Sequence, residues 1–238
     1  ILNFTVRRTA ALNTPQAFAA ITTSLLRVND DTRRLDILNG LSAALKGQRR
    51  VAMPEGWPAV ETKLAAGTNT EIRALVQSLS LTFGSANALA ELRQTLMDKS
   101  ADVAARKTAF DSLLAVKDAG LPPLLRQLLN DPALRGAALR GLGNYDDAQT
   151  PDAILPLYPT FTDAYKRDAR NTLASRSTFA LRLLAAVEAG QIPRSDLTAD
   201  LIQQLRNLKN PEIDALLPKV WGVARDSSAD KQAEIDKY

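Results

Sequence analysis

The sequence predicts an all-α fold, and more narrowly a right-handed α-solenoid of about six helix pairs. Apolar residues recur at helical spacing along nearly all of the 238 residues, and the alternation typical of β-strands is almost absent. The helical segments are short and follow one another in pairs joined by short loops. A shared pattern of basic and apolar residues also recurs in the second segment of successive pairs, which is typical of repeat proteins.

Cap residues and turn residues set the limits of the expected helices in chain order. The first pair covers 14–28, which opens at Thr14, and 30–47, which opens at Asp30 or Asp31. The remaining segments are 56–67, 68–84, 85–98, 100–120, 121–130, 130–147, 150–161, 162–176, 177–190, 198–210 and 211–225. The prolines inside 150–161 are expected to shorten or kink that helix.

The stretch NDPALRGAALRGLGNYDD, residues 130–147, shows how one such helix is specified. Asp131 can accept hydrogen bonds from the first free backbone N–H groups, and Pro132 follows where a missing N–H costs nothing. Gly143 and Asn144 are expected to form a left-handed turn at the helix end. A helix of about a dozen residues is marginal alone, so this one must lean on neighbouring pairs. Its apolar face carries Leu134, Ala138, Leu139 and Leu142.

A basic residue occupies one place in the second helix of five successive pairs, namely Arg34, Arg73, Arg106, Arg135 and Lys166. Three residues further on, each helix has an apolar residue: Ile37, Val76, Ala109, Ala138 and Ala169. Seven residues further on stand Leu41, Ser80, Leu113, Leu142 and Leu173, with Ser80 as the one departure. This recurrence predicts a common buried seam, because a single helix pair cannot bury its own apolar face.

The pattern Asp-Pro-x-Leu-Arg-x-x-Ala-Leu-x-x-Leu at 131–142 resembles the second half of a HEAT repeat, and 98–114 and 162–176 are looser copies. The resemblance implies a superhelix of the HEAT-like or armadillo type. It also implies a ladder of hydrogen bonds between acidic and basic residues of neighbouring repeats. The ladder residues would be Asp131 and Arg135, with Asp98, Arg106 and Arg167 as further members.

Residues 189–238 show a second and more particular resemblance, carried by IPRSDL, QQLRNLKNPEIDALLPKVWG and DKQAEIDKY. They are similar to the segment that precedes the c-type haem-binding (Cys-x-x-Cys-His) domain in large multidomain bacterial proteins of the membrane-bound dehydrogenase-like group. Those proteins commonly join a β-propeller, HEAT repeats and a c-type cytochrome domain. The resemblance implies an extracytoplasmic location, periplasmic or secreted. We therefore expect 1–238 to be one HEAT-like domain of a longer chain, with 1–13 a remnant of a preceding repeat and 226–238 the start of a linker helix.

The composition excludes several classes of function. The chain has no Cys and no His, so covalent haem attachment, the usual zinc sites and Ser-His or Cys-His catalysis are impossible within it. The net charge is only +4, with 30 basic and 26 acidic residues that alternate along most segments. Nucleic-acid binders instead concentrate positive charge on one face. We expect no catalytic residue, no cofactor and no metal site, no membrane span, and a monomer.

The remaining candidate sites each have a structural alternative. Four basic clusters could bind an acidic partner or form solvated faces and ladders: Arg33-Arg34, Arg49-Arg50, Arg106-Lys107 and Lys166-Arg167-Arg170. The pairs Asp30-Asp31 and Asp146-Asp147 could bind a cation, but both fit helix caps better. Trp57 and Trp221 are expected in the core rather than at an interface, and Tyr145, Tyr158 and Tyr165 at a joint between repeats.

These observations favour a non-catalytic scaffold or protein-interaction module. It would space a catalytic or sugar-binding domain from a c-type cytochrome domain, or present a surface to a protein partner. The alternative is a nucleic-acid-binding HEAT-repeat protein, which requires a continuous positive groove with stacking aromatic residues. A third class, an enzyme that uses two converging carboxylates, has no sequence spacing here that predicts it.

Overall fold

A computed structural model describes residues 1–48 and 51–221 and confirms that the fold is all-α. Within these residues there are fourteen α-helices, two short 3₁₀ segments and no strand. The chain divides into two compact units, Ile1–Leu121 and Pro122–Tyr238. No helix in the described ranges is long and apolar enough to cross a membrane. The expected linker helix at 226–238 and the Arg49-Arg50 pair lie outside the described residues.

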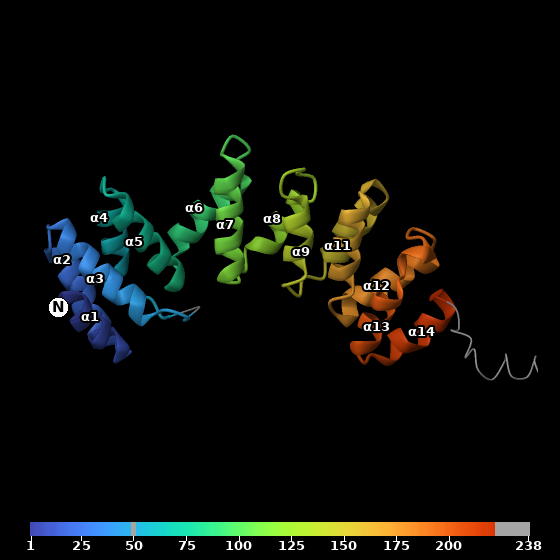
Figure 1. The fold of residues 1–238 in the computed structure, drawn as a ribbon, viewed down its shortest axis with the longest axis horizontal. Coiled ribbons are helices and arrows are strands. Elements are labelled where there is room, and N and C mark those ends of the chain that lie inside the picture. Colours follow the sequence, from blue (N-terminus) through green and yellow to red (C-terminus); the bar gives the residue numbers. More distant parts are fainter. Residues whose placement is uncertain (49–50, 222–238) are drawn as a thin grey trace, which may run out of the picture. The chain divides into compact units, whose positions relative to one another are not determined.

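The first unit contains seven helices (Figure 1): α1 Leu2–Ala11, α2 Pro15–Arg27, α3 Asp31–Ala44, α4 Trp57–Ala65, α5 Thr70–Thr82, α6 Ala86–Met97 and α7 Val103–Ala115. Helix α3 packs between α1 and α5, while α4 packs on both α2 and α5. Helices α6 and α7 form a further packed pair. The second helices α3 and α5 thus contact each other, and α3 also packs on α1.

The second unit is built from shorter helices. In chain order they are α8 Leu121–Leu128, which begins at the unit boundary, α9 Arg135–Leu142, α10 Thr150–Ile154, α11 Asp163–Leu173, α12 Ser177–Glu188, α13 Ala199–Asn207 and α14 Pro211–Trp221. Helix α11 packs on α9 and α12, and α14 packs on α12 and α13. The segment 150–161 breaks as expected, because prolines divide it into α10 and a 3₁₀ turn at Leu155–Thr160.

Of the predicted caps, Thr14 caps α2, and Asp30 rather than Asp31 caps α3. The aligned basic residue lies four positions after a residue whose side-chain oxygen accepts a hydrogen bond from a backbone N–H in the following turn. These cap residues are Asp30, Asn69, Asp102, Asp131 and Thr162. Helices α3, α5, α7 and α11 therefore start directly after their cap residue. Helix α9 starts only at Arg135, after a turn at 132–134, so the predicted helix start at Asp131-Pro132 is wrong.

The predicted end of the 130–147 helix is wrong in its geometry. Gly143 has a right-handed backbone, with φ −62°, and Asn144 is not left-handed either. The side-chain amide of Asn144 instead donates hydrogen bonds to Arg140 O at 3.2 Å and Gly141 O at 3.3 Å. Because this amide satisfies two carbonyls of the last turn, the chain leaves the helix without a left-handed residue.

The predicted burial of the aligned positions is confirmed in all five helices; a seam common to all the pairs stays a prediction. The residues three positions after the basic residue are all at most 2% exposed, and those seven positions after it, Ser80 included, are all fully buried. Ser80 has a specific partner, since its Oγ accepts a hydrogen bond from Trp57 Nε1 at 2.9 Å. The departure from leucine in α5 thus supplies the acceptor that a buried indole N–H needs.

A close approach of helices α1 and α3 depends on Gly40. A Cβ atom at this position would lie 2.5 Å from the backbone oxygen of Asn3 and 3.0 Å from Val6 Cβ. The segment 1–13 is therefore a helix packed directly on α3; its origin as a remnant of a preceding repeat stays a prediction.

We expect Gly40→Ala to lower the free energy of unfolding by about 1–3 kcal/mol, because the backbones of α1 and α3 must separate. In an unconstrained helix the same change raises stability by about 0.5–1 kcal/mol. Urea unfolding followed by far-UV circular dichroism measures the difference. Ser42→Ala, in the same helix, is the control and should change stability by less than about 0.5 kcal/mol. A stabilised Gly40→Ala variant contradicts this packing.

Candidate interaction surfaces

Three of the five aligned basic residues bind the end of the preceding helix. Arg34 Nε donates to Val28 O at 3.0 Å, Arg106 Nε to Leu96 O at 2.9 Å, and Arg135 Nε to Leu129 O at 2.7 Å. In each case the acceptor carbonyl lies at or just beyond the last turn of the first helix of the pair. The recurring arginine therefore caps the C-terminus of its partner helix, where carbonyl groups lack partners within the helix.

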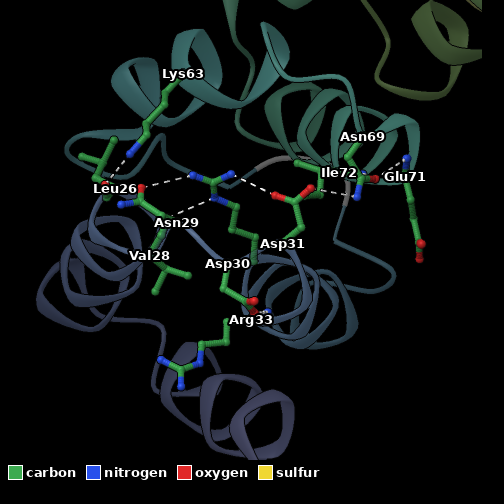
Figure 2. Close-up of polar contacts among 11 residues, drawn as sticks. Leu26, Val28, Asn29, Asp30, Asp31, Arg33, Lys63, Asn69, Glu71 and Ile72 are labelled. Atoms are coloured by element: carbon green, nitrogen blue, oxygen red, sulfur yellow. Dashed lines mark hydrogen bonds and ion pairs between the residues drawn. The ribbon is translucent and has the colours of Figure 1, made fainter.

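Figure 2 shows this cap extended into a network between two successive pairs of the first unit. Arg34 also pairs with Asp31 at 2.9 Å, and the other carboxylate oxygen of Asp31 accepts a hydrogen bond from Asn69 Nδ2 at 3.1 Å. Lys63 Nζ donates to Leu26 O at 2.7 Å. Asp31 thus links α3 to the cap of α5, and Lys63 links α4 to the end of α2, so Arg34 and Asp31 serve packing here.

The five predicted ladder residues have the following positions. Asp131 Oδ1 accepts from Ala133 N at 2.9 Å, and Asp98 Oδ1 accepts from Ser100 Oγ at 2.6 Å and Ser100 N at 2.9 Å. The Ser100 hydrogen bonds lower the pKa of the Asp98 carboxyl. Arg106 is buried in α7, whereas Arg167 is exposed on α11. These contacts lie within single pairs, and the ladder between repeats stays a prediction.

Polar contacts do join successive pairs in the second unit, through residues that the sequence analysis did not select. Arg140 in α9 pairs with Asp168 in α11 at 2.6 Å, and Thr172 Oγ1 donates to Leu139 O at 2.7 Å. Arg176 Nη2 donates to Gly143 O at 2.8 Å. Helices α9 and α11 are therefore linked by side-chain contacts as well as by their buried faces.

Arg135 makes a further contact between these two pairs. Its guanidinium lies 5.8 Å from the ring centroid of Phe161 and 5.5 Å from that of Tyr165. Tyr158 and Tyr165 in turn have edge contacts with Phe161, at 6.5 and 6.4 Å between ring centroids. Tyr158 and Tyr165 therefore lie in an aromatic cluster with Phe161, which Arg135 of α9 contacts; that this cluster is a joint between repeats stays a prediction.

We expect Arg135→Ala to lower the free energy of unfolding by about 2 kcal/mol, because a charged hydrogen bond to the buried Leu129 carbonyl and the ring contacts are lost. Arg167→Ala removes the same side chain from an exposed site of α11 and should cost less than about 0.5 kcal/mol. Arg135→Lys should not restore stability, since an ammonium cannot reproduce the planar contact with both rings. Equal losses for Arg135→Ala and Arg167→Ala contradict this role.

A buried tyrosine lies at the centre of the second unit. Tyr158 is 1% exposed, its hydroxyl donates to Asp196 at 2.5 Å, and it accepts from Arg170 at 3.2 Å. Arg170 also pairs with Asp196 at 3.3 Å. Burial and the hydrogen bond to Asp196 raise the pKa of the Tyr158 phenol.

This raised pKa predicts a loss of stability at alkaline pH. The folded protein holds the Tyr158 proton more tightly than the unfolded chain, so the contribution is complete below about pH 10 and is lost as the pH rises further. The loss should reach about 1.4 kcal/mol per pH unit. In denaturant titrations above this pH, Tyr158→Phe should lose stability less steeply than the parent. If the stability of Tyr158→Phe and of the parent falls with the same slope, the Tyr158 phenol ionises as readily in the folded protein as in the unfolded chain, which contradicts the raised pKa.

The acidic pairs and Trp221 depart in part from expectation. Asp30 caps α3 as predicted, but Asp31 binds Arg34 and Asn69, while Asp147 pairs with Arg126 as well as accepting from Gln149 N. The expectation that Trp221 lies in the core is wrong: it is 37% exposed, and its Nε1 donates to Leu197 O at 2.9 Å. Trp57, by contrast, is fully buried as expected.

Two adjoining grooves in the first unit were not predicted from the sequence. The α3–α5 groove, of about 460 Å³, includes Asn39 and Ser42, and the α5–α7 groove, of about 400 Å³, includes Gln77 and Ser112. Ser78 of α5 lines both. These residues lack a recognisable motif, and only the packing of α3 on α5, and of α6 on α5 and α7, brings them together.

The described residues contain no group of three or more acidic side chains close enough to hold a metal ion. The side chains described in this subsection cap helices, pair across neighbouring helices or line the two grooves. No family model matches the chain, and no curated protein or solved structure matches it.

Proposed function

We propose that this chain is a non-catalytic interaction scaffold whose helix pairs form a right-handed α-solenoid of about six pairs. The observation that carries the proposal is the recurrent register: five helices bury the same two positions after an aligned basic residue, and in three of them the aligned arginine caps the preceding helix. Four of the five also begin directly after a capping side chain. Elements that repeat in this way are stabilised by their neighbours rather than by one central core.

The use of the polar side chains supports a structural role. Arg34, Asp31 and Asn69 join two pairs in the first unit, and Arg140 and Asp168 join two in the second. The buried hydroxyl of Tyr158 bonds to Asp196 and Arg170 in a joint between helices. Groups held in this way serve packing, and they leave the grooves and outer faces for a partner.

The resemblance of 189–238 to the segment before a c-type haem domain supports a place in a larger polypeptide. In that proposal the solenoid spaces a catalytic or sugar-binding domain from a cytochrome domain outside the cytoplasm. The sequence of the parent gene tests it. About thirty residues beyond Tyr238 should include Cys-x-x-Cys-His, and a following sequence of another kind contradicts this placement.

Peptide selection tests the interaction role. Random fifteen-residue peptides displayed on phage are panned against the immobilised chain and against a blank surface. An interaction scaffold should enrich peptides that bind the folded chain and that are released when it is unfolded by urea. If repeated rounds enrich nothing over the blank surface, the interaction role is contradicted.

A DNA-cellulose column tests the nucleic-acid alternative. Arg34, Arg140 and Arg170 pair with carboxylates, and Arg106 and Arg135 bind backbone carbonyls, so the chain should elute at low salt. Retention that falls steeply with salt, as phosphate contacts require, favours the alternative instead.

A further inference from the structure

The two grooves of the first unit differ from the rest of the chain in charge. Among the described residues that line them, Lys46 alone carries a charge, whereas 24% of the residues in the sequence are charged. Alanine, hydroxyl and amide side chains make up most of the lining. A charged ligand such as nucleic acid or an acidic peptide therefore has little to pair with here.

The polar side chains around the grooves, hydroxyls and amides, are of two kinds. Several bond to their own helix: Thr82 to Ser78 O at 3.1 Å, Thr108 to Ala104 O at 3.0 Å, and Ser112 to Thr108 O at 2.8 Å. In contrast, the side chains of Asn39, Gln77 and Ser78 make no hydrogen bond to any other described residue. Their polar atoms are available to a ligand, and each lies on a second helix facing a groove.

Amide and hydroxyl groups of this kind match the main chain of a peptide. The side chains of Asn and Gln offer both an acceptor oxygen and donor N–H groups, which is the pair that a peptide unit presents. Packed helices lie about 8–10 Å apart, which equals about three residues of extended chain. A peptide that crosses from α3 to α5, which pack on each other, can thus meet the second helix roughly three residues after the first.

We propose that the two grooves together bind an uncharged, extended peptide segment that crosses α3, α5 and α7. Its main chain bonds to Asn39, Gln77 and Ser78, and its small or apolar side chains enter the grooves beside them. Main-chain bonding supplies the affinity and the grooves select the side chains, as in other modes of peptide recognition. This inference rests on the proposed interaction role and names the surface and the chemistry of the partner.

The test uses peptides enriched in the selection described above, labelled with a fluorophore and titrated with the full chain. Two matched variants place the same charge at different sites: Gln77→Arg in the α5–α7 groove and Gln94→Arg on α6, outside the groove lining. Gln77→Arg and Asn39→Asp should each weaken binding about tenfold or more. Gln94→Arg should bind like the parent, and circular dichroism checks that all variants fold.

The outcomes separate the two proposals. Peptides that carry low net charge, bind equally at low and high salt and depend on Gln77 and Asn39 support the grooves. Peptides that bind with no dependence on these residues overturn this inference but leave the interaction role standing. Strongly charged peptides with salt-sensitive binding overturn the chemistry proposed here. The absence of any enriched peptide contradicts both proposals together.

Discussion

We expect Trp57→Ala to lower the free energy of unfolding of the first unit by about 3–5 kcal/mol. Trp57 is fully buried, and its ring centroid lies 4.7 Å from that of Phe83 in an edge contact. The change leaves a cavity and removes the donor to Ser80 Oγ. Urea unfolding followed by far-UV circular dichroism measures the loss.

A matched set of variants separates the cavity from the hydrogen bond. Ser80→Ala alone leaves the indole N–H buried without a partner and should cost about 1–3 kcal/mol. Trp57→Phe combined with Ser80→Ala removes both partners and should cost less than the two single changes added together. Trp221→Ala, at a 37% exposed site, should cost clearly less than Trp57→Ala. Equal losses for the two tryptophans contradict the burial described here.

Leu139→Ala should lower the free energy of unfolding of the second unit by about 2–5 kcal/mol. Leu139 is fully buried in α9, and its backbone oxygen accepts the hydrogen bond from Thr172 of α11. The cavity therefore opens at the contact between two successive pairs. Denaturant unfolding of the variant and the parent gives the difference.

Leu12→Ala is the control for this change, because Leu12 is 67% exposed at the end of α1. It should alter stability by less than about 0.5 kcal/mol. The neighbour-dependent account also expects helix α11 to lose protection from hydrogen exchange in Leu139→Ala, because its packing partner is disturbed. Unchanged exchange in α11 would show that α9 and α11 are stabilised independently.

The sequence alone specifies the seam of this fold because the seam is a local property. A cap residue, a basic residue four positions later and buried positions three and seven beyond it all lie within one helix. Helix propensity and periodicity can therefore predict them, and the burial of the aligned positions is confirmed in all five helices. The same local reasoning found Asp30 as a cap and Trp57 as a core residue.

Contacts between residues that lie far apart in the sequence could not be predicted by such local reasoning. Trp57 and Ser80 lie far apart in the sequence, so the reason for the serine in α5 appears only when α4 packs on α5. The pairing of Arg140 with Asp168 and the two neutral grooves likewise depend on which helix faces which. Trp221 fits an apolar helical face, yet the packing of α14 leaves its ring partly in solvent.

The recurring arginine shows where a pattern was found but its role was incomplete. Its spacing marked helices that bury the same positions, and the resemblance to HEAT repeats implied a ladder role for Arg106 and Arg135 among the aligned residues. In α3, α7 and α9 the Nε atom instead caps the end of the helix just before it. An unpaired carbonyl at a helix end leaves no trace in the sequence, so only the structure reveals this acceptor.

Small-angle X-ray scattering from the chain in solution tests the α-solenoid most directly. A stack of about six helix pairs spaced about 10 Å apart predicts a radius of gyration of about 22 Å or more, with an asymmetric distribution of interatomic distances. A compact domain of the same length has a radius of gyration of about 18 Å and a symmetric distribution. The compact result would contradict the stacked arrangement, and with it the scaffold role proposed for the chain.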